Sequence, residues 1–175
     1  MVDDLQQRCA RIEMLVLDVD GVLTDGRIVY SDQGDEIKAF HVRDGSAMKI
    51  WQRLGKRIGI ITGRDSRIVA RRAKELGVTA LIQGSDDKRA ALTQMLNEQG
   101  IEPQAVCCVG DDLPDLPLLR AAGLAVAVAD ACTEAKQAAH HVAMTSGGRG
   151  AVREVIELIL RAQGRWEDVL KRYAG

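Results

Sequence analysis

The sequence predicts an α/β fold, in which a doubly wound parallel sheet carries helices on both faces and a β-hairpin projects from the end of the first strand. Three observations lead to this prediction. Five short apolar runs alternate with segments of helical period, which is the pattern of βαβ units. The apolar runs show little polar alternation, so the strands are expected to be buried on both faces. A polar cluster follows each of the first four runs.

The expected elements follow one another in a regular order. The strands are residues 14–19, 57–62, 80–84, 105–110 and 124–128. The helices are residues 66–77, 88–100, 113–123 and 152–160, the last predicted from apolar residues at helical spacing. Gly77, Gly100 and Gly123 are expected to end the first three helices in the left-handed conformation. Right-handed crossovers between such units give a parallel sheet, whose ligands bind beyond the carboxyl ends of the strands.

Residues 27–42, RIVYSDQGDEIKAFHV, depart from this rhythm. They alternate apolar and polar residues around a turn-forming stretch at residues 31–34, which predicts a β-hairpin. The hairpin carries the aromatic residues Tyr30 and Phe40. Exposed aromatic side chains are unfavourable in a monomer, so we expect the hairpin to pack on another subunit.

Length and composition narrow the class of protein. A chain of 175 residues fits a single domain over residues 1–175, with a mobile tail expected at residues 164–175. The net charge of −1 disfavours a broad nucleic-acid surface. A polar N-terminus and the lack of long apolar runs predict no secretory signal, no membrane contact and a cytoplasmic location. The four cysteines lack metal-ligand spacing and are expected to be buried free thiols.

The polar clusters at the strand ends are expected to meet at one edge of the sheet. They contain Asp18 and Asp20, then residues 62–64, then residues 84–88, then residues 110–112. Asp18 and Asp20 lie on the same side of an extended chain, where two carboxylates repel unless a cation or a proton intervenes. Helix capping is the simpler interpretation for Asp65, Ser66, Ser85 and Asp112.

Capping does not account for the whole set. Asp111 adds a third carboxylate to Asp18 and Asp20, and such an oxygen cluster suits Mg²⁺. Lys88 lies in the first turn of its helix, where the macrodipole disfavours a cation, which indicates an anionic partner. Together with the Thr62 hydroxyl, these groups are the parts needed to transfer a phosphoryl group.

The motifs DVDGVLT, IITGR, Lys88 and GDDLPD resemble, in order and spacing, the four motifs of the haloacid dehalogenase superfamily over nearly the whole chain. The resemblance implies a Rossmann-like fold of that type. It implies that Asp18 attacks phosphorus, and that Asp20 protonates the leaving alcohol and then activates water. The resemblance further implies that Asp18 and Asp111 bind Mg²⁺ by their side chains and Asp20 by its backbone carbonyl. Asp112 and Asp115 have supporting or capping roles.

The chain has no insertion large enough for a cap domain. The stretches GVLTDGRIVYSDQGDEIKAFHVRDG, QGSDDK, VGDDLPDLPLL and GGRGAVREV resemble the capless, tetrameric members of the superfamily that act on sugar-acid phosphates, in particular on an octulosonate 8-phosphate of lipopolysaccharide synthesis. This resemblance implies a homotetramer in which the hairpin of one subunit helps to close its neighbour's site. Arg64 is the first candidate to bind the substrate's carboxylate, beside the backbone of Gly63. The other substrate-binding candidates are His41, Arg43 and Asp44.

Two alternatives remain open at this point. A phosphatase of nonulosonate 9-phosphates shares the fold, the metal and the assembly, and Arg64 favours the octulosonate. A receiver module of signalling proteins also uses a phosphorylatable aspartate, a threonine and a lysine on a doubly wound sheet. The second acid, Asp20, follows the first by two residues and supplies an acid–base group for turnover that a receiver lacks.

Overall fold

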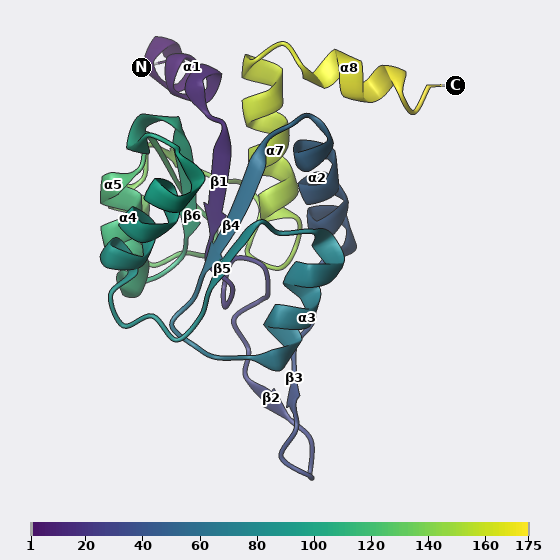
Figure 1. The fold of residues 1–175 in the computed structure, drawn as a ribbon, viewed down its shortest axis with the longest axis vertical. Helices are drawn as coiled ribbons and strands as arrows, with labels where there is room; N and C mark the ends of the chain where they lie inside the picture. The colour runs from purple at the N-terminus through teal and green to yellow at the C-terminus, as the bar shows by residue number, and fades with distance from the viewer. Residues whose placement is uncertain (1, 175) are drawn as a thin grey trace.

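The centre of the computed structural model, which describes residues 2–174, is a six-stranded sheet (Figure 1). Its strands are β1 (Met14–Leu17), β4 (Arg57–Ile61), β5 (Ala80–Ile82), β6 (Val106–Gly110), β7 (Leu124–Ala127) and β8 (His141–Val142). They lie in the order β5-β4-β1-β6-β7-β8, and every neighbouring pair is parallel. The residues of β1, β6 and β7 are all buried, as apolar strands without alternation predict.

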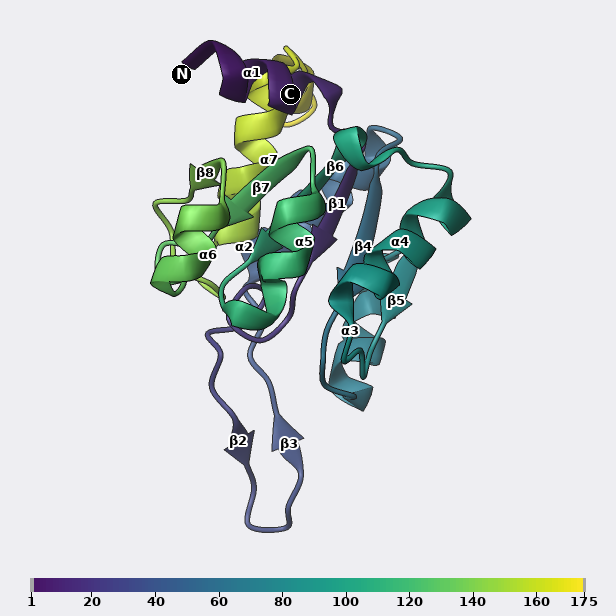
Figure 2. The same cartoon turned by 90° about the vertical axis from the view of Figure 1, so that its left-hand side faces the viewer.

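Helices cover both faces of the sheet (Figures 1 and 2). One face carries α2 (Val42–Arg53), α3 (Arg67–Leu76) and α7 (Ala151–Ala162), and the other carries α4 (Lys88–Gln99), α5 (Leu116–Ala121) and α6 (Thr133–Ala138). Short 3-10 turns occur at η1 (Pro103–Ala105) and η2 (Leu113–Asp115). Helices α1 (Val2–Arg11) and α8 (Trp166–Lys171) lie at the end of the molecule where β1 begins. The predicted doubly wound fold is confirmed.

The strand order fixes where a ligand can bind. The chain runs outward from β1 through β4 to β5, then returns to β6 on the other side of β1 and runs outward again. The register places Leu15 opposite both Ile58 and Cys107. The direction of winding therefore reverses between β1 and β6, which is the switch point where doubly wound sheets bind ligands. Asp18 and Asp111 follow directly after these two strands.

The predicted hairpin is present and extends beyond the carboxyl end of the sheet (Figure 2). It contains β2 (Val29–Tyr30) and β3 (Glu36–Ile37), which pair antiparallel, and a turn closed by a hydrogen bond from the Gly34 amide to the Ser31 carbonyl. Of its two aromatic residues only Tyr30 is exposed. Phe40 is half-buried, with the Arg72 guanidinium 5.8 Å from its ring centre, so the expectation of two exposed aromatics is corrected.

The segment expected to be a mobile tail, residues 164–175, contains a helix. Helix α8 forms there, and Trp166 and Val169 are buried. The Trp166 ring lies 5.1 Å from the guanidinium groups of both Arg153 and Arg161, an arrangement that anchors the helix to α7. The last residue of the tail, residue 175, lies outside the described part of the chain.

Gly123 corrects a second expectation. Gly77 and Gly100 end their helices in the left-handed conformation, as predicted, but α5 ends at Ala121 and Gly123 does not adopt a positive φ. A Cβ atom at Gly123 would lie 2.1 Å from the Gln104 carbonyl oxygen. The glycine is therefore required by close backbone approach rather than by helix termination.

Within the described residues 2–174, only the hairpin stands between β1 and α2, and no helix is both long and apolar enough to span a membrane. The four cysteines are free thiols, as expected, and burial raises the pKa of Cys9 to about 11. Cys132 is half-buried rather than fully buried.

Candidate active site

The four polar clusters meet in one open cavity of about 520 Å³ at the carboxyl ends of the strands. The cavity brings together all of the predicted catalytic and metal-binding residues and several of their predicted neighbours. Its lining includes Asp18, Asp20, Thr62, Gly63, Arg64, Lys88, Asp111, Asp112 and Asp115.

A buried ion-pair triad lies at the bottom of this site. The Lys88 Nζ atom lies 2.6 Å from Asp18 Oδ1 and 2.6 Å from Asp115 Oδ1. All three side chains are buried. Burial alone would lower the pKa of Lys88, but the two carboxylates outweigh it and the pKa is raised. Lys88 occupies the first residue of α4 despite the helix dipole, because these anions compensate for that position.

Asp111 is positioned by the turn that follows β1. Gly21, in this turn, has φ of +100°, and a Cβ atom there would lie 2.0 Å from Asp111 Oδ2. The sequence Asp-Gly at residues 20–21 therefore allows the Asp111 carboxylate to approach the backbone beside Asp18. On the other side, the Asp111 amide donates a hydrogen bond of 2.9 Å to Asp115 Oδ2.

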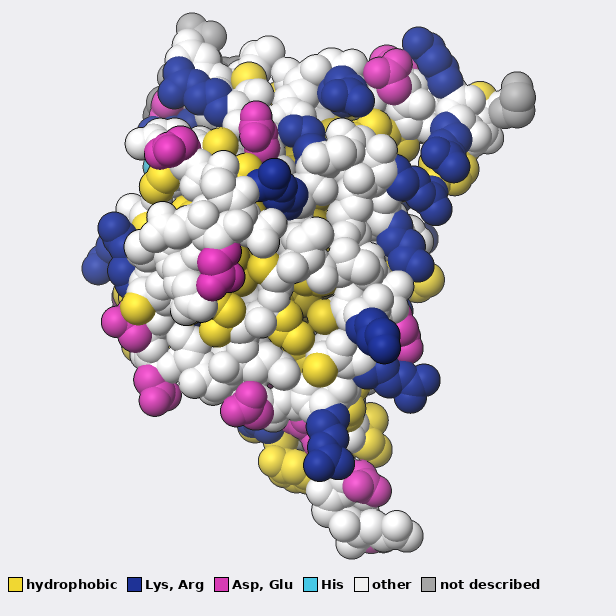
Figure 3. Space-filling model, in the orientation of Figure 1, with side chains coloured by type: hydrophobic (Ala, Val, Ile, Leu, Met, Phe, Trp, Pro, Cys, Tyr) yellow, Lys and Arg dark blue, Asp and Glu magenta, His cyan; other side chains and the backbone are white. Residues whose placement is uncertain are grey.

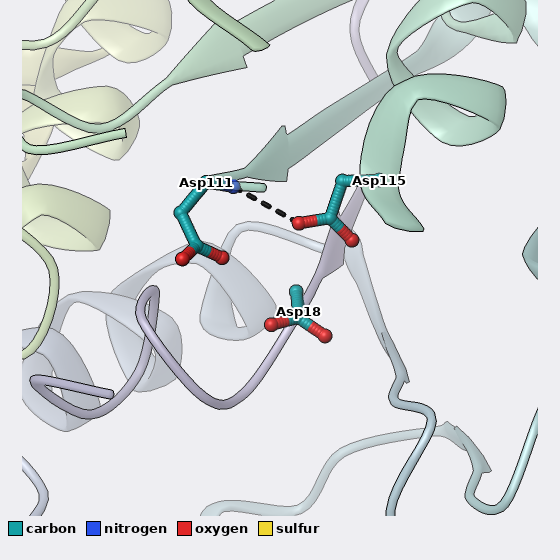
Figure 4. A group of neighbouring side chains, drawn as sticks. All are labelled: Asp18, Asp111 and Asp115. Atoms are coloured by element: carbon teal, nitrogen blue, oxygen red, sulfur yellow. Dashed lines mark hydrogen bonds between the residues drawn. The ribbon is translucent and has the colours of Figure 1, made fainter. Parts of the chain in front are cut away.

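The acidic groups fit a divalent metal ion. One oxygen from each of Asp18, Asp111 and Asp115 lies within 4.8 Å of the others (Figure 4). Burial raises the pKa of both Asp18 and Asp111, and repulsion from the neighbouring carboxylates raises it further. The cluster offers only oxygen ligands, and its three carboxylates carry more negative charge than Lys88 can neutralise. Such a cluster suits a hard cation such as Mg²⁺.

The three carboxylates are not equivalent toward a metal. Asp115 already accepts hydrogen bonds from Lys88 and from the amides of Asp111 and Asp112, which fits its predicted supporting role. Of the three, Asp18 and Asp111 are the carboxylates that could hold an ion by their side chains. The Asp20 carboxylate contacts Lys38 and Arg64 instead, so only its backbone carbonyl is available for the predicted metal contact.

The loop after β4 is held against the loop after β5. The Thr62 amide donates to the Ile82 carbonyl at 3.0 Å, and the Ser85 amide donates to the Thr62 carbonyl at 3.1 Å. Thr62 itself is buried, and its hydroxyl oxygen accepts a long hydrogen bond of 3.4 Å from the Arg64 amide. These contacts fix the Thr62 hydroxyl and the Gly63 backbone on the cavity wall.

Helix capping explains part of the expected set. Asp112 and Asp115 form a reciprocal capping box at η2. Asp87, rather than Ser85, caps α4 by accepting a hydrogen bond of 2.9 Å from the Ala90 amide. Ser66 stands at the start of α3, but its hydroxyl donates to Glu36 at 2.7 Å instead of capping the helix.

Sequence reasoning missed two residues of the site, Glu36 and Lys38, on the return side of the hairpin. Lys38 Nζ contacts Asp20 Oδ1, and it lies 3.2 Å from Glu36 Oε1. Glu36 Oε1 also accepts a hydrogen bond of 2.9 Å from Arg64. The sequence did offer one signal for them. Glu36 and Lys38 carry opposite charges and are two residues apart, a spacing that places both side chains on the same side of a strand.

Three predicted substrate-binding residues do not line the cavity. The chain turns into α2 at Val42, which places Arg43 and Asp44 in the first turn of this helix and His41 at its N-cap. Asp44 is 1% exposed, and its Oδ1 accepts a hydrogen bond of 2.8 Å from the Arg153 amide near the start of α7. Within one subunit, Asp44 therefore connects two helices away from the cavity, and its expected contact with substrate stays a prediction.

The fold and the site are those of a haloacid dehalogenase-like hydrolase, and the model of that family matches residues 78–156. The chain is 46% identical over 167 residues to the 3-deoxy-D-manno-octulosonate 8-phosphate phosphatase of Yersinia pestis, a match that covers 95% of this chain and 89% of the relative. It is 44% identical over 165 residues to the phosphatase of the same name from Escherichia coli K12, with 94% and 88% covered.

A solved structure supports the same assignment. The phosphatase of this name from Moraxella catarrhalis, in complex with a magnesium ion, a phosphate ion and KDO, superposes with a TM-score of 0.96 at 41% identity, covering 99% of both chains. The chain belongs to the family of 3-deoxy-D-manno-octulosonate 8-phosphate phosphatases.

Proposed function

We propose that this protein is a Mg²⁺-dependent phosphatase that hydrolyses 3-deoxy-D-manno-octulosonate 8-phosphate to the free sugar acid and phosphate. One observation carries the proposal. Asp18, paired with Lys88 and adjacent to Asp111, lies at the switch point of a sheet that this chain shares with phosphatases of that substrate. The Moraxella catarrhalis relative holds magnesium, phosphate and the sugar-acid product together, which supports the same ligands here.

In the proposed reaction, Asp18 and Asp20 divide the chemistry between them. A carboxylate oxygen of Asp18 attacks phosphorus and forms an aspartyl-phosphate as the bond from phosphorus to the sugar oxygen breaks. Asp20 gives its proton to that leaving oxygen. Asp20 then takes a proton from the water that attacks the aspartyl-phosphate, so that phosphate leaves and the Asp18 carboxylate is restored.

Other residues bind charge and fix geometry. Lys88 holds Asp18 in place through the 2.6 Å contact and offsets negative charge. The Thr62 hydroxyl and the Gly63 amide are proposed to donate hydrogen bonds to the phosphate oxygens. Mg²⁺ held by Asp18 and Asp111 supplies the positive charge that the phosphate ester requires.

Arg64 is proposed to bind the carboxylate of the sugar acid. Its guanidinium is partly exposed on the cavity wall and forms a 2.9 Å hydrogen bond with Glu36. A planar guanidinium can bind two carboxylates along different edges, so the substrate can share Arg64 with Glu36. This contact favours an octulosonate over an uncharged sugar phosphate.

The active assembly is proposed to be a cytoplasmic homotetramer that serves lipopolysaccharide precursor synthesis. Hydrophobic side chains gather at the hairpin (Figure 3), where Ile28, Tyr30 and Ile37 are 54%, 60% and 51% exposed. Such a patch on a projecting segment is typical of an interface. In the proposed tetramer the hairpin packs against a neighbouring subunit and helps to cover its open cavity.

Phosphate release from a panel of sugar-acid and simple sugar phosphates, with Mg²⁺ present, tests this function. We expect the highest kcat/KM on 3-deoxy-D-manno-octulosonate 8-phosphate. A higher kcat/KM on a nonulosonate 9-phosphate would assign the protein to the other substrate. An aspartyl-phosphate that persists for minutes without phosphate release would favour the signalling alternative.

A further inference from the structure

The return side of the hairpin supplies a buried cation to the active site of its own subunit. The side chain of Lys38 is 1% exposed, and its Nζ atom contacts Asp20 Oδ1 and lies 3.2 Å from Glu36 Oε1. An ammonium group is buried at a large cost in free energy unless anions surround it. The two carboxylates therefore define where Lys38 lies, and Lys38 in turn restrains them.

Glu36 fastens this strand to the loop after β4. Its two oxygens accept hydrogen bonds of 2.9 Å from Arg64 and 2.7 Å from the Ser66 hydroxyl. These contacts lower the pKa of Glu36, and the hydrogen bond from Ser66 contributes most. Glu36 is therefore a carboxylate at neutral pH. The position of Lys38 is thus set by a hydrogen-bonded network that reaches the start of α3.

The network leaves Asp20 between two cations. Lys38 contacts its Oδ1 atom, while Arg64 Nε lies 3.8 Å from its Oδ2 atom. The Asp20 side chain is 21% exposed and lines the cavity, so these two contacts restrain a carboxylate that is otherwise partly open to solvent. The shorter of the two contacts is the one from Lys38.

We propose that Lys38 is a positioning residue for the phosphatase reaction, which fixes the orientation of the Asp20 carboxylate and thereby couples the placement of the hairpin to turnover. The inference rests on the proposed function. Lys38 acts through Asp20 and does not touch the substrate. Because Asp20 must meet first the leaving oxygen and then the attacking water, a freely rotating carboxylate slows both steps.

Steady-state kinetics on the octulosonate 8-phosphate separate this role from a general structural one. Lys38→Met is expected to lower kcat by about 10- to 100-fold, with little change in KM, because it misplaces Asp20 without removing it and so costs less than the loss of a general acid–base. Lys38→Arg is expected to recover part of kcat, because it keeps a donor near Asp20. The matched control is Lys49→Met, on the exposed side of α2, which is expected to retain wild-type kcat.

A double-mutant cycle tests whether Lys38 acts through Asp20. If it does, Lys38→Met combined with Asp20→Asn is expected to be no slower than Asp20→Asn alone. Multiplicative losses in the double variant would overturn the proposal, and so would wild-type kcat in Lys38→Met. If Lys38→Met does not fold, Lys38→Gln, which also removes the cation, replaces it in the same cycle with the same two outcomes.

The leaving group provides a readout that a loosened fold does not reproduce. With p-nitrophenyl phosphate the leaving group needs little protonation, so Lys38→Met is expected to release p-nitrophenol in a burst of one per site and then turn over slowly. A lowered rate without a burst would contradict the role assigned to Lys38. Wild-type protein that releases no phosphate from any sugar phosphate would refute the proposed function instead, which distinguishes the two failures.

Discussion

At the scale of residues, the site depends on buried charges that compensate one another. Asp18, Lys88 and Asp115 are each buried, and each would be strongly destabilising without its partners. Asp111 adds a carboxylate that no lysine or arginine contacts in the described residues 2–174. A divalent metal ion at Asp18 and Asp111, as proposed, would complete the balance of charge.

The first prediction concerns Gly21. Gly21→Ala places a Cβ atom against Asp111 and strains a backbone with φ of +100°. A misplacement of about 1 Å at a reacting group can lower the rate by about 10²-fold, and we expect a loss of kcat of that order. Gly55→Ala is the matched control, because Gly55 also has a positive φ but has no atom within 4 Å of the added Cβ. Equal loss of activity in both variants would contradict this account.

The second prediction concerns magnesium and pH. The pKa is raised from 3.8 to about 7 for Asp18 and to about 8 for Asp111. Between the ordinary pKa of 3.8 and these raised values, the folded chain holds protons that the unfolded chain has released. The stability of metal-free protein therefore falls as pH rises from about 4 to about 8. Mg²⁺ binds the ionised carboxylates and should raise Tm more at pH 8 than at pH 5.

The size of this effect follows from mass action. Mg²⁺ at 100 times its Kd stabilises the folded state by about 2.7 kcal/mol, or roughly 5–10 °C in Tm for a chain of this length. Thermal melts with Mg²⁺ or a chelator measure it. An Mg²⁺-induced shift that survives in Asp111→Ala would place the metal elsewhere.

Several of the site residues could be predicted from the sequence because they follow buried strands directly. Asp18, Thr62 and Asp111 each stand next to the last residue of a parallel strand, and topology alone brings such positions together. Lys38 and Glu36 could not be placed in this way. They lie on a hairpin whose direction relative to the sheet depends on tertiary contacts rather than on the alternation of its residues.

At the scale of elements, α2 and α7 illustrate how the helices on one face hold the sheet. The two helices pack against each other, and Asp44 of α2 accepts a hydrogen bond from the Arg153 amide in the first turn of α7. This bond satisfies one of the backbone donors left free at a helix N-terminus. Asp44 therefore connects two helices that are far apart in sequence.

The third prediction follows from this contact. Asp44→Ala should lower the free energy of unfolding by about 1–2 kcal/mol, as the loss of a helix cap does, and leave KM unchanged. Urea unfolding and steady-state kinetics measure the two effects. Asp44→Asn keeps an acceptor and should lose less. A raised KM with unchanged stability would restore the original interpretation of Asp44 as a substrate contact.

The elements differed in how well the sequence predicted them. Five of the six strands in the sheet were predicted because their apolar runs are uninterrupted, and β8 was missed because it has only two residues. Helix α2 was not predicted, because the apolar–polar alternation of the preceding hairpin extends to the start of the helix. Its buried residues do have helical spacing: Ala47, Met48, Ile50 and Trp51. Helix α8 was missed for a related reason, since its buried residues, Trp166 and Val169, are too few to show a period.

At the scale of the whole molecule, the site and the hairpin share one end. Both chain ends lie at the opposite end, where β1 begins (Figure 1). The hairpin contacts the wall of the open cavity through Lys38 and Asp20, and its Ile28, Tyr30 and Ile37 side chains are exposed. Its return side belongs to the site of its own subunit through Lys38, while its exposed residues are available for a neighbour. A single hairpin can thus serve catalysis and assembly together.

The fourth prediction tests the assembly. Ile37 is 51% exposed in the subunit, and Ile37→Lys should shift the protein from a tetramer toward smaller species in sedimentation velocity. Burying a lysine in an apolar interface is unfavourable, which is the reason for the expected dissociation. Thr93→Lys, on the exposed side of α4, adds the same charge away from the hairpin and should remain tetrameric. A wild-type monomer with full activity would contradict the proposed tetramer.

The most direct test of the account is the rate of phosphate release from 3-deoxy-D-manno-octulosonate 8-phosphate by Asp18→Asn, measured beside the wild type with saturating Mg²⁺. The replacement removes the attacking carboxylate but leaves Asp115 to pair with Lys88, so the fold should persist. We predict that kcat falls by about 10⁴-fold or more while the melting curve remains cooperative. Turnover by Asp18→Asn near the wild-type rate would show that the cluster at the switch point does not perform the reaction.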